Sequence, residues 1–156
     1  MPLPTTLAGL ARSVRMRPLH MDDHAACLAL WRQCDGVAVR MWEDASAMTR
    51  LIERNPDMSC AAEVAGRLVG TVLCGHDGWR GWLYHVAVDP TWRRRGLATA
   101  LVSRAQAEMA KAGIRRVHAL MLSGNRDAMQ FWSAAGWRQR EDLSVVSFEF
   151  SAATLN

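Results

Sequence analysis

The sequence contains a single tyrosine, a single lysine and no apolar run long enough to span a bilayer. Its four cysteines include no C-x-x-C pair, no His/Cys set has the spacing of a structural metal site, and no segment resembles a secretory signal. These absences argue against a membrane protein, a disulfide-rich secreted protein and a module built around a structural metal. We therefore expect reduced thiols, no bound metal, no membrane partner and a cytoplasmic location.

Domain boundaries are also lacking. The 156 residues show no internal repeat, low-complexity segment or linker. A chain of this length is sufficient for one domain with a core of its own. We expect residues 1–12 to be an N-terminal extension and residues 13–156 to form a single domain.

Positive charge is present in modest excess and is unevenly placed. The net charge is +4; residues 1–76 hold eight basic and eight acidic side chains, whereas residues 77–156 hold eleven and seven. A basic second half suits a ligand with several phosphates. Nucleic acid is the rival explanation, but the basic residues form no long stripe, are not interleaved with stacking aromatics and match no nucleic-acid-binding motif. We expect no nucleic-acid partner.

The stretch from Val86 to Leu101 has the pattern of a strand end, a basic turn and a helix start. An apolar strand ends at Asp89-Pro90, and apolar residues then recur at helical spacing until Gly113. The recurring positions are Leu97, Leu101, Val102, Ala105 and Met109. The three arginines at 93–95 and Gly96 are thus predicted at a helix N-terminus.

That position favours an anion. Backbone N–H groups at a helix N-terminus are unpaired, the helix dipole is positive there, and Gly96 lets the backbone approach a ligand without a Cβ. Arg93, Arg94 and Arg95 add charge and directional donors for phosphate oxygens. The alternative is a solvated basic turn that happens to precede a helix.

Two motifs in this order resemble a known family. Arg93-x-x-Gly96-x-Ala98 resembles the acyl-CoA pyrophosphate signature of the GNAT N-acetyltransferase superfamily. The second GNAT motif consists of an Asn, an Ala, an aromatic pair and a Gly followed by an aromatic. The chain resembles it at Asn125, Ala128, Phe131-Trp132 and Gly136-Trp137. The resemblance covers about residues 13 to 150. The sequence at residues 30–35 and 75–81 is similar to that of the small YpeA-like bacterial subgroup.

The resemblance implies an α/β fold with a central mixed, mostly antiparallel sheet between helices, in three layers. Periodicity places strands at 13–17, 59–64, 67–73, 82–88 and 117–122, and helices at about 22–33, 44–54, 96–112 and 128–135. The last strands are expected within 137–150. In the GNAT fold the strands at 82–88 and 117–122 splay apart, and the pantetheine arm of the cofactor lies in the opening.

The resemblance also implies a cofactor site. Acetyl-CoA would pair its pantetheine with the backbone of Val86, Ala87 and Val88, and the Val86 N–H is the candidate oxyanion donor. The amides from Arg94 to Thr99, including those of Leu97 and Ala98, would hold the pyrophosphate. Asn125 would contact pantetheine or order the following helix, with a simple helix cap as the alternative.

One departure from the family pattern affects the chemistry. The second aromatic of the pair is usually a tyrosine that donates a proton to the leaving thiolate, and here it is Trp132. An indole N–H donates a hydrogen bond but does not deliver a proton near neutral pH. Trp132 is expected to pack against the thioester or pantetheine instead. This departure keeps open a second function, a weakly active or inactive acyl-CoA-binding regulatory module.

Proton transfer then requires other groups. Tyr84 is the first candidate, and strict alternation along its strand puts it on the face of Trp82 and Val86, with His85 on the opposite face. His118 is the second candidate, and His85 is a further relay candidate; the alternative for each residue is a purely structural role. His76-Asp77 is a weaker candidate base.

The expected acceptor wall includes Trp42, Glu43 and Asp44, which would suit a cationic amine or simply cap a helix. From these features we expect transfer of an acetyl group from acetyl-CoA to a primary amine. The seven tryptophans are compatible with a homodimer interface or with the core.

Overall fold

The structure, a computed structural model, describes residues 13–40 and 44–155, and the chain divides into two compact units that meet at Asn125/Arg126. Each unit is described by itself. In the described part of the chain no helix combines the length and the apolar character needed to cross a membrane.

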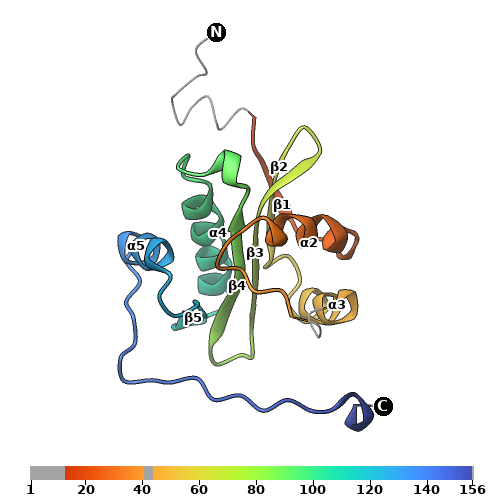
Figure 1. Cartoon of the computed structure of the whole chain (residues 1–156), viewed down its shortest axis with the longest axis vertical. Helices are drawn as coiled ribbons and strands as arrows, with labels where there is room; N and C mark the ends of the chain where they lie inside the picture. Colours follow the sequence, from red (N-terminus) through yellow and green to blue (C-terminus); the bar gives the residue numbers. More distant parts are fainter. Residues whose placement is uncertain (1–12, 41–43, 156) are drawn as a thin grey trace. The chain divides into compact units, whose positions relative to one another are not determined.

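The first unit is built on a five-stranded sheet in the order β1-β2-β3-β4-β5 (Figure 1). Its strands are β1 (Arg15–Pro18), β2 (Cys60–Val64), β3 (Arg67–His76), β4 (Gly81–Val88) and β5 (Val117–Ala119). Neighbouring strands are antiparallel except for the parallel pair β4 and β5. The predicted mixed, mostly antiparallel sheet is confirmed.

Helices cover both faces of this sheet, which makes the predicted three layers. One side carries α2 (His24–Arg32), preceded by the short helix η1 (Met21–Asp23), and α3 (Ala45–Arg54); the other carries α4 (Leu97–Lys111) (Figure 1). The short helix η2 (Pro90–Trp92) connects β4 to α4.

The α2 and α3 side holds a buried cluster that includes Trp31, Met48, Leu73 and Ala87. On the α4 side, glycines in the sheet let the helix approach closely. A Cβ added at Gly70 would lie 3.0 Å from Leu101 Cδ1, and one added at Gly81 would lie 2.7 Å from Met109 Sδ. Leu101 and Met109, predicted from helical spacing, are fully buried here.

Residues 126–155 make the second unit, which contains α5 (Arg126–Ala134) and the short helix η3 (Ala152–Thr154). Gly136, with φ of 84°, ends α5: the N–H of Trp137 bonds the carbonyl of Trp132 at 2.9 Å, and that of Gly136 bonds Ser133 at 3.1 Å. The rings of Trp132 and Trp137 pack with centroids 4.7 Å apart. This is a Schellman cap with its apolar contact.

The prediction of strands within 137–150 was wrong. Residues 137–150 contain no strand, and their apolar side chains are exposed, with Val146 at 93% and Phe148 at 82%. The alternating pattern supplies β propensity, but a strand also needs a neighbour to take its backbone hydrogen bonds. The second unit contains no strand that could serve as that neighbour.

Candidate active site

Hydrogen bonds and an ion pair of Asp89 hold the turn between β4 and α4. This residue is 2% exposed, accepts hydrogen bonds from the backbone N–H and the hydroxyl of Thr91 at 2.9 and 2.7 Å, and pairs with Arg67 at 2.6 Å. Burial raises the pKa of Asp89, but the bonds from Thr91 and the charge of Arg67 outweigh it and leave that pKa below its ordinary value. The carboxylate therefore stays ionised and holds the turn in place.

The turn then presents its backbone at the start of α4. Gly96 has φ of 80° and directly precedes Leu97, the first residue of the helix. The Arg95 guanidinium lies 4.8 Å from the Trp92 ring centroid, and Arg93 Nε donates to the Val88 carbonyl at 3.3 Å. The structure thus brings the arginines and the free amides of a fifteen-residue helix to one place, which is the arrangement of an anion site.

β4 and β5 pair over only three residues. The ladder runs from Gly81 opposite Val117 to Leu83 opposite Ala119, where β5 ends. From Tyr84 to Val88 the structure describes no strand that pairs with this edge of β4. The backbone of Val86, Ala87 and Val88 therefore runs along an unpaired edge toward the basic turn, as the predicted splay requires.

A β-bulge interrupts β4 at the point where the strands part. Thr71 of β3 is opposite Ala87, but Leu73 is opposite Tyr84, so β4 contains one extra residue. His85 has φ of 46° in this bulge. The Thr71 hydroxyl donates to the His85 carbonyl at 3.0 Å and accepts from Trp31 Nε1 at 2.9 Å.

The bulge changes which side chains share a face. Tyr84 and His85 line the same pocket, so the expectation that His85 lies opposite Tyr84 was wrong. Past the bulge, Ala87 joins the buried cluster against which Tyr84 packs, so Ala87 takes the place on that face that alternation had assigned to Val86. Strict alternation fails because a bulge adds a residue to one strand only.

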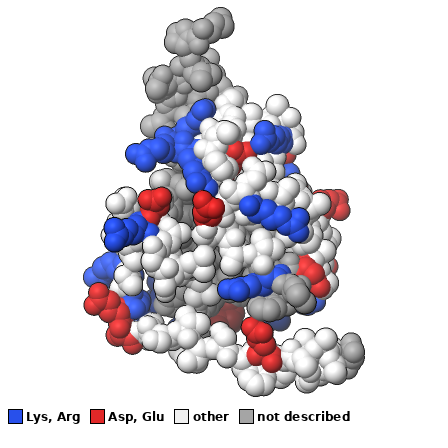
Figure 2. All heavy atoms as spheres, viewed as in Figure 1, with Lys and Arg blue, Asp and Glu red and all other residues white. Residues whose placement is uncertain are grey.

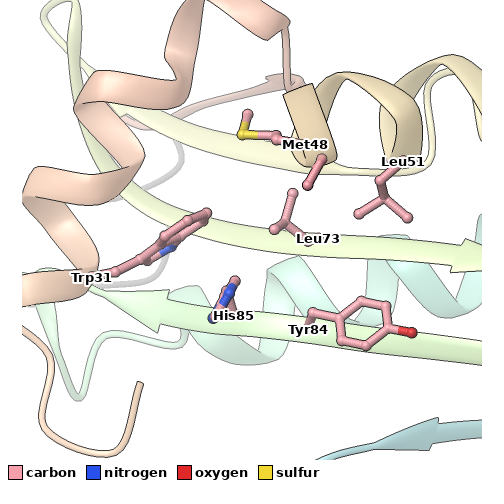
Figure 3. A pocket seen from close by; sticks show the side chains of 7 residues that line it. Trp31, Met48, Leu51, Leu73, Tyr84 and His85 are labelled. Atoms are coloured by element: carbon pink, nitrogen blue, oxygen red, sulfur yellow. The ribbon is translucent and has the colours of Figure 1, made fainter. Parts of the chain in front are cut away.

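The pocket has a volume of about 120 Å³ and lies between α2 and α3 on one side and β3 and β4 on the other (Figure 3). The ring of His85 stacks on Trp31 with centroids 4.2 Å apart. The pocket is lined by Trp31, Ala47, Met48, Leu51, Leu73, Tyr84 and His85. The pocket and the basic turn thus lie on one strand, on either side of the bulge.

Residues 17–137 match the acetyltransferase (GNAT) family. The chain belongs to the GNAT family. It is 37% identical over 117 residues to an acetyltransferase of Pectobacterium atrosepticum, which covers 74% of this chain and 81% of that protein. Homologues of this name and the family match establish it as an N-acetyltransferase. The membership confirms the resemblance of the two motifs; assignment to the YpeA-like subgroup stays a prediction.

Solved structures show the same fold. AAC(6')-Iy, in complex with the bisubstrate analogue CoA-S-monomethyl-acetylneamine, superposes with a TM-score of 0.67 at 16% identity over 89% of this chain and 99% of that one. Glucosamine-6-phosphate N-acetyltransferase of Arabidopsis thaliana gives a TM-score of 0.64 at 17% identity, covering 88% and 99% of the two chains. A GNAT neighbour therefore binds a CoA derivative on this fold.

Tyr84 is the best placed of the predicted proton donors in this GNAT enzyme. It is half-buried, and burial, with a smaller effect of the negative charge of Asp77, raises the pKa of its phenol above the ordinary value. The phenol is therefore neutral throughout the physiological range and available as a donor. His118, by contrast, lies beside Trp82, with ring centroids 4.9 Å apart, and does not line the pocket.

The other predicted residues have diverse positions. Asn125 Nδ2 lies where a Cβ on Gly36 would be, so its amide packs against the loop that follows α2. Trp132 packs against Phe131 and Trp137 inside the second unit. Trp42 and Glu43 lie outside the described residues.

The acidic candidates are engaged locally. Asp44 is exposed and caps α3, accepting from Ala47 N at 2.9 Å and Ser46 Oγ at 2.8 Å. Asp77 accepts from the amides of Trp79 and Arg80, and His76 Nδ1 accepts from Gly78 N. Within residues 13–40 and 44–155, no three His, Cys, Asp or Glu side chains gather into a group that could bind a metal ion.

The sequence offered His85 as a relay candidate but placed it on the face away from Tyr84, so its position in the pocket was not predicted. Histidine is among the few residue types enriched at positive φ, which is a weak signal for a bulge at this position. The decisive features, Thr71 on the neighbouring strand and Trp31 on α2, lie 14 and 54 residues away. No local pattern connects them.

Proposed function

We propose that this enzyme moves the acetyl group of acetyl-CoA to a primary amine by direct attack in a ternary complex. The observation that carries the proposal is the bulge in β4, which lies between a basic helix N-terminus and a pocket lined by Tyr84 and His85. One strand thus joins a site for phosphates to a site for an acceptor.

The phosphate end has two parts in this proposal, backbone amides and arginine side chains. The amides from Arg94 to Thr99 hold the pyrophosphate, because they belong to the turn before α4 and to the first residues of that helix. Arg93, Arg94 and Arg95 supply charge. Interspersed acidic side chains, seen across the face in Figure 2, separate the basic side chains into groups, which favours a local anion site over a continuous nucleic-acid track.

Along the unpaired edge, Val86, Ala87 and Val88 bond pantetheine as a strand would, and the Val86 N–H points its dipole at the thioester oxygen. By the resemblance, Asn125 contacts the pantetheine arm, and Trp132 corresponds to the family's second aromatic position. These roles come from the resemblance and the positions along β4.

The amine must reach the carbonyl as a free base. The C–N bond forms and the C–S bond breaks; the amine loses a proton to a base, and the thiolate gains one from an acid. His85 is the base that lines the pocket, with His118 as a more distant relay, and Tyr84 is the acid. A thiol of ordinary pKa leaves readily, so Tyr84 accelerates the step without being indispensable.

A calorimetric titration with acetyl-CoA tests the cofactor site. We expect micromolar binding to the wild type and at least about 100-fold weaker binding to Gly96→Asp, because a carboxylate would face the phosphates from a left-handed position. Gly66→Asp is the matched control: Gly66 has φ of 78°, with open space around its Cβ position, so it carries similar backbone strain at the β2–β3 turn.

The results separate the candidate functions. Binding lost only in Gly96→Asp, followed by amine-dependent release of free thiol, supports the acetyltransferase proposal. Binding without thiol release with any amine favours the regulatory module that Trp132 keeps open. No binding by the wild type would contradict both.

A further inference from the structure

The lining of the pocket is almost entirely apolar. Ala47, Met48 and Leu51 come from α3, Leu73 comes from β3, and Trp31 comes from α2 (Figure 3). The one polar atom of Trp31 donates to Thr71 and is fully engaged. Among the described lining residues, the polar contribution therefore comes from the phenol of Tyr84 and the imidazole of His85.

Among the described residues that line the pocket there is no carboxylate, amide or hydroxyl apart from the phenol. Asp44, the described acid predicted for the acceptor, is bound to the N-terminus of α3. A second charge or several hydroxyls on the acceptor would lose water here without gaining partners, which costs free energy. The apolar lining of the pocket thus selects against polyamines and sugars as acceptors.

The size of the pocket limits the acceptor as well. A dry apolar cavity of about 150 Å³ binds benzene. At about 120 Å³ the present pocket is slightly smaller and is open at one side. It suits an apolar group of about four to six carbon atoms.

We propose that the acceptor is a primary monoamine carried on an apolar carbon frame of this size, with the frame against Met48, Leu51 and Leu73 and the amine near Tyr84 and His85. This inference rests on the proposed function and specifies the substrate of the same site. The hydrophobic frame supplies the binding energy, and the two polar side chains orient the nitrogen.

The test compares primary amines at saturating acetyl-CoA, with kcat/KM expressed per concentration of the free-base amine. In the series from ethylamine to butylamine, we expect kcat/KM for thiol release to rise about fourfold per methylene, the value of one buried methylene. Isopentylamine and benzylamine should have the highest kcat/KM values of the set. Ethanolamine and 1,4-diaminobutane should lie at least about tenfold below butylamine.

Two variants tie this preference to the pocket. Ala47→Phe should fill most of the pocket and lower kcat/KM for isopentylamine about tenfold or more, with a smaller loss for ethylamine. Leu51→Asp should reverse the order of butylamine and 1,4-diaminobutane. Ala45→Phe, an exposed position on the same helix, is the matched control and should keep the wild-type order.

The failure of this inference is distinguishable from that of the proposed function. If ethanolamine or 1,4-diaminobutane is acetylated as well as butylamine, the enzyme is a transferase and the apolar acceptor is wrong. If acetyl-CoA binds but no amine releases thiol, transfer is wrong, and benzylamine binding is then followed by the Met48 methyl and Trp31 indole resonances. Shifts abolished by Ala47→Phe support the apolar pocket; no shifts would overturn it.

Discussion

The proposed proton donation to the leaving thiolate depends on the phenol of Tyr84. Half-burial on β4 raises its pKa, and the negative charge of Asp77 acts in the same direction. A neutral phenol beside a leaving thiolate can donate its proton, whereas an ionised one could not. Raising this pKa thus extends the pH range over which the donor is present.

Replacing Tyr84 by phenylalanine removes the phenolic hydroxyl, and with it the donated proton, and keeps the ring. We expect kcat to fall about 100-fold, the lower end of what a positioned acid contributes, while the Kd for acetyl-CoA stays within about twofold. In the wild type, kcat should show no decline from tyrosine ionisation below about pH 10, because the pKa is shifted upward from its ordinary value. Steady-state thiol release across pH measures both. Normal turnover by Tyr84→Phe would show that another group donates the proton.

At the scale of the element, the bulge in β4 is held by a neighbouring strand and a helix. The Thr71 hydroxyl is fully buried and connects the Trp31 indole to the His85 carbonyl. Without this hydroxyl, the buried N–H of Trp31 and the partly buried C=O of His85 would each lose a partner. The position of His85 in the pocket therefore depends on a threonine on β3.

Thr71→Val keeps the shape of this side chain and removes its hydroxyl. We expect the free energy of unfolding to fall by about 2 to 4 kcal/mol, since the buried Trp31 N–H loses its partner at about 1 to 3 kcal/mol and the partly buried His85 carbonyl loses its partner at a smaller cost. Urea unfolding measures the change. Thr49→Val on α3, whose hydroxyl bonds the Ala45 carbonyl at an exposed position, is the control and should change stability by about 0.5 kcal/mol or less. Equal losses in the two variants would contradict the role given to Thr71.

Elements with strong terminal signals could be predicted from the sequence. Asp44 caps α3 as expected, and Gly113 follows α4, which ends at Lys111. The β2–β3 hairpin turns at Ala65-Gly66 as predicted. These boundaries are set by residues within one turn of the helix or hairpin end, so local pattern contains the information.

The bulge and residues 137–150 could not be predicted in the same way. The bulge at His85 depends on contacts with Thr71 and Trp31, which no window around residue 85 contains. Residues 137–150 have strand-like alternation, yet strand formation depends on a partner that their own sequence does not specify. In the candidate site, Tyr84 was singled out because it is the only tyrosine, and His85, named as a relay candidate, was placed on the wrong face because alternation counts residues and cannot detect an extra one.

At the scale of the whole molecule, burial of the four cysteines links stability to alkaline pH. Burial raises the pKa of Cys27 and of Cys74 from 9.0 to about 12. The unfolded thiols would ionise near pH 9 while the folded ones stay protonated. Stability from these groups is therefore complete below about pH 9 and is lost as pH rises toward about 12.

Unfolding free energies measured between about pH 8 and pH 10.5 test this linkage. Each of the two thiols should lower the free energy of unfolding by about 2 kcal/mol at about pH 10.5. The free energy of unfolding of Cys27→Ala should therefore fall by about 2 kcal/mol less than that of the wild type over this range. Val72→Ala is the control for core truncation: Val72 is fully buried and does not titrate, so its loss should be the same at every pH. Parallel curves for the wild type and Cys27→Ala would contradict the prediction.

The presence of one tyrosine in the whole chain has an optical consequence. A phenol changes its ultraviolet absorption when it ionises, and the tryptophans, which dominate the spectrum, do not titrate. An absorbance titration of the intact protein is therefore a titration of one position on β4. Any acceptor that buries Tyr84 further will delay the appearance of the tyrosinate band, so the unlabelled enzyme reports the filling of its own pocket.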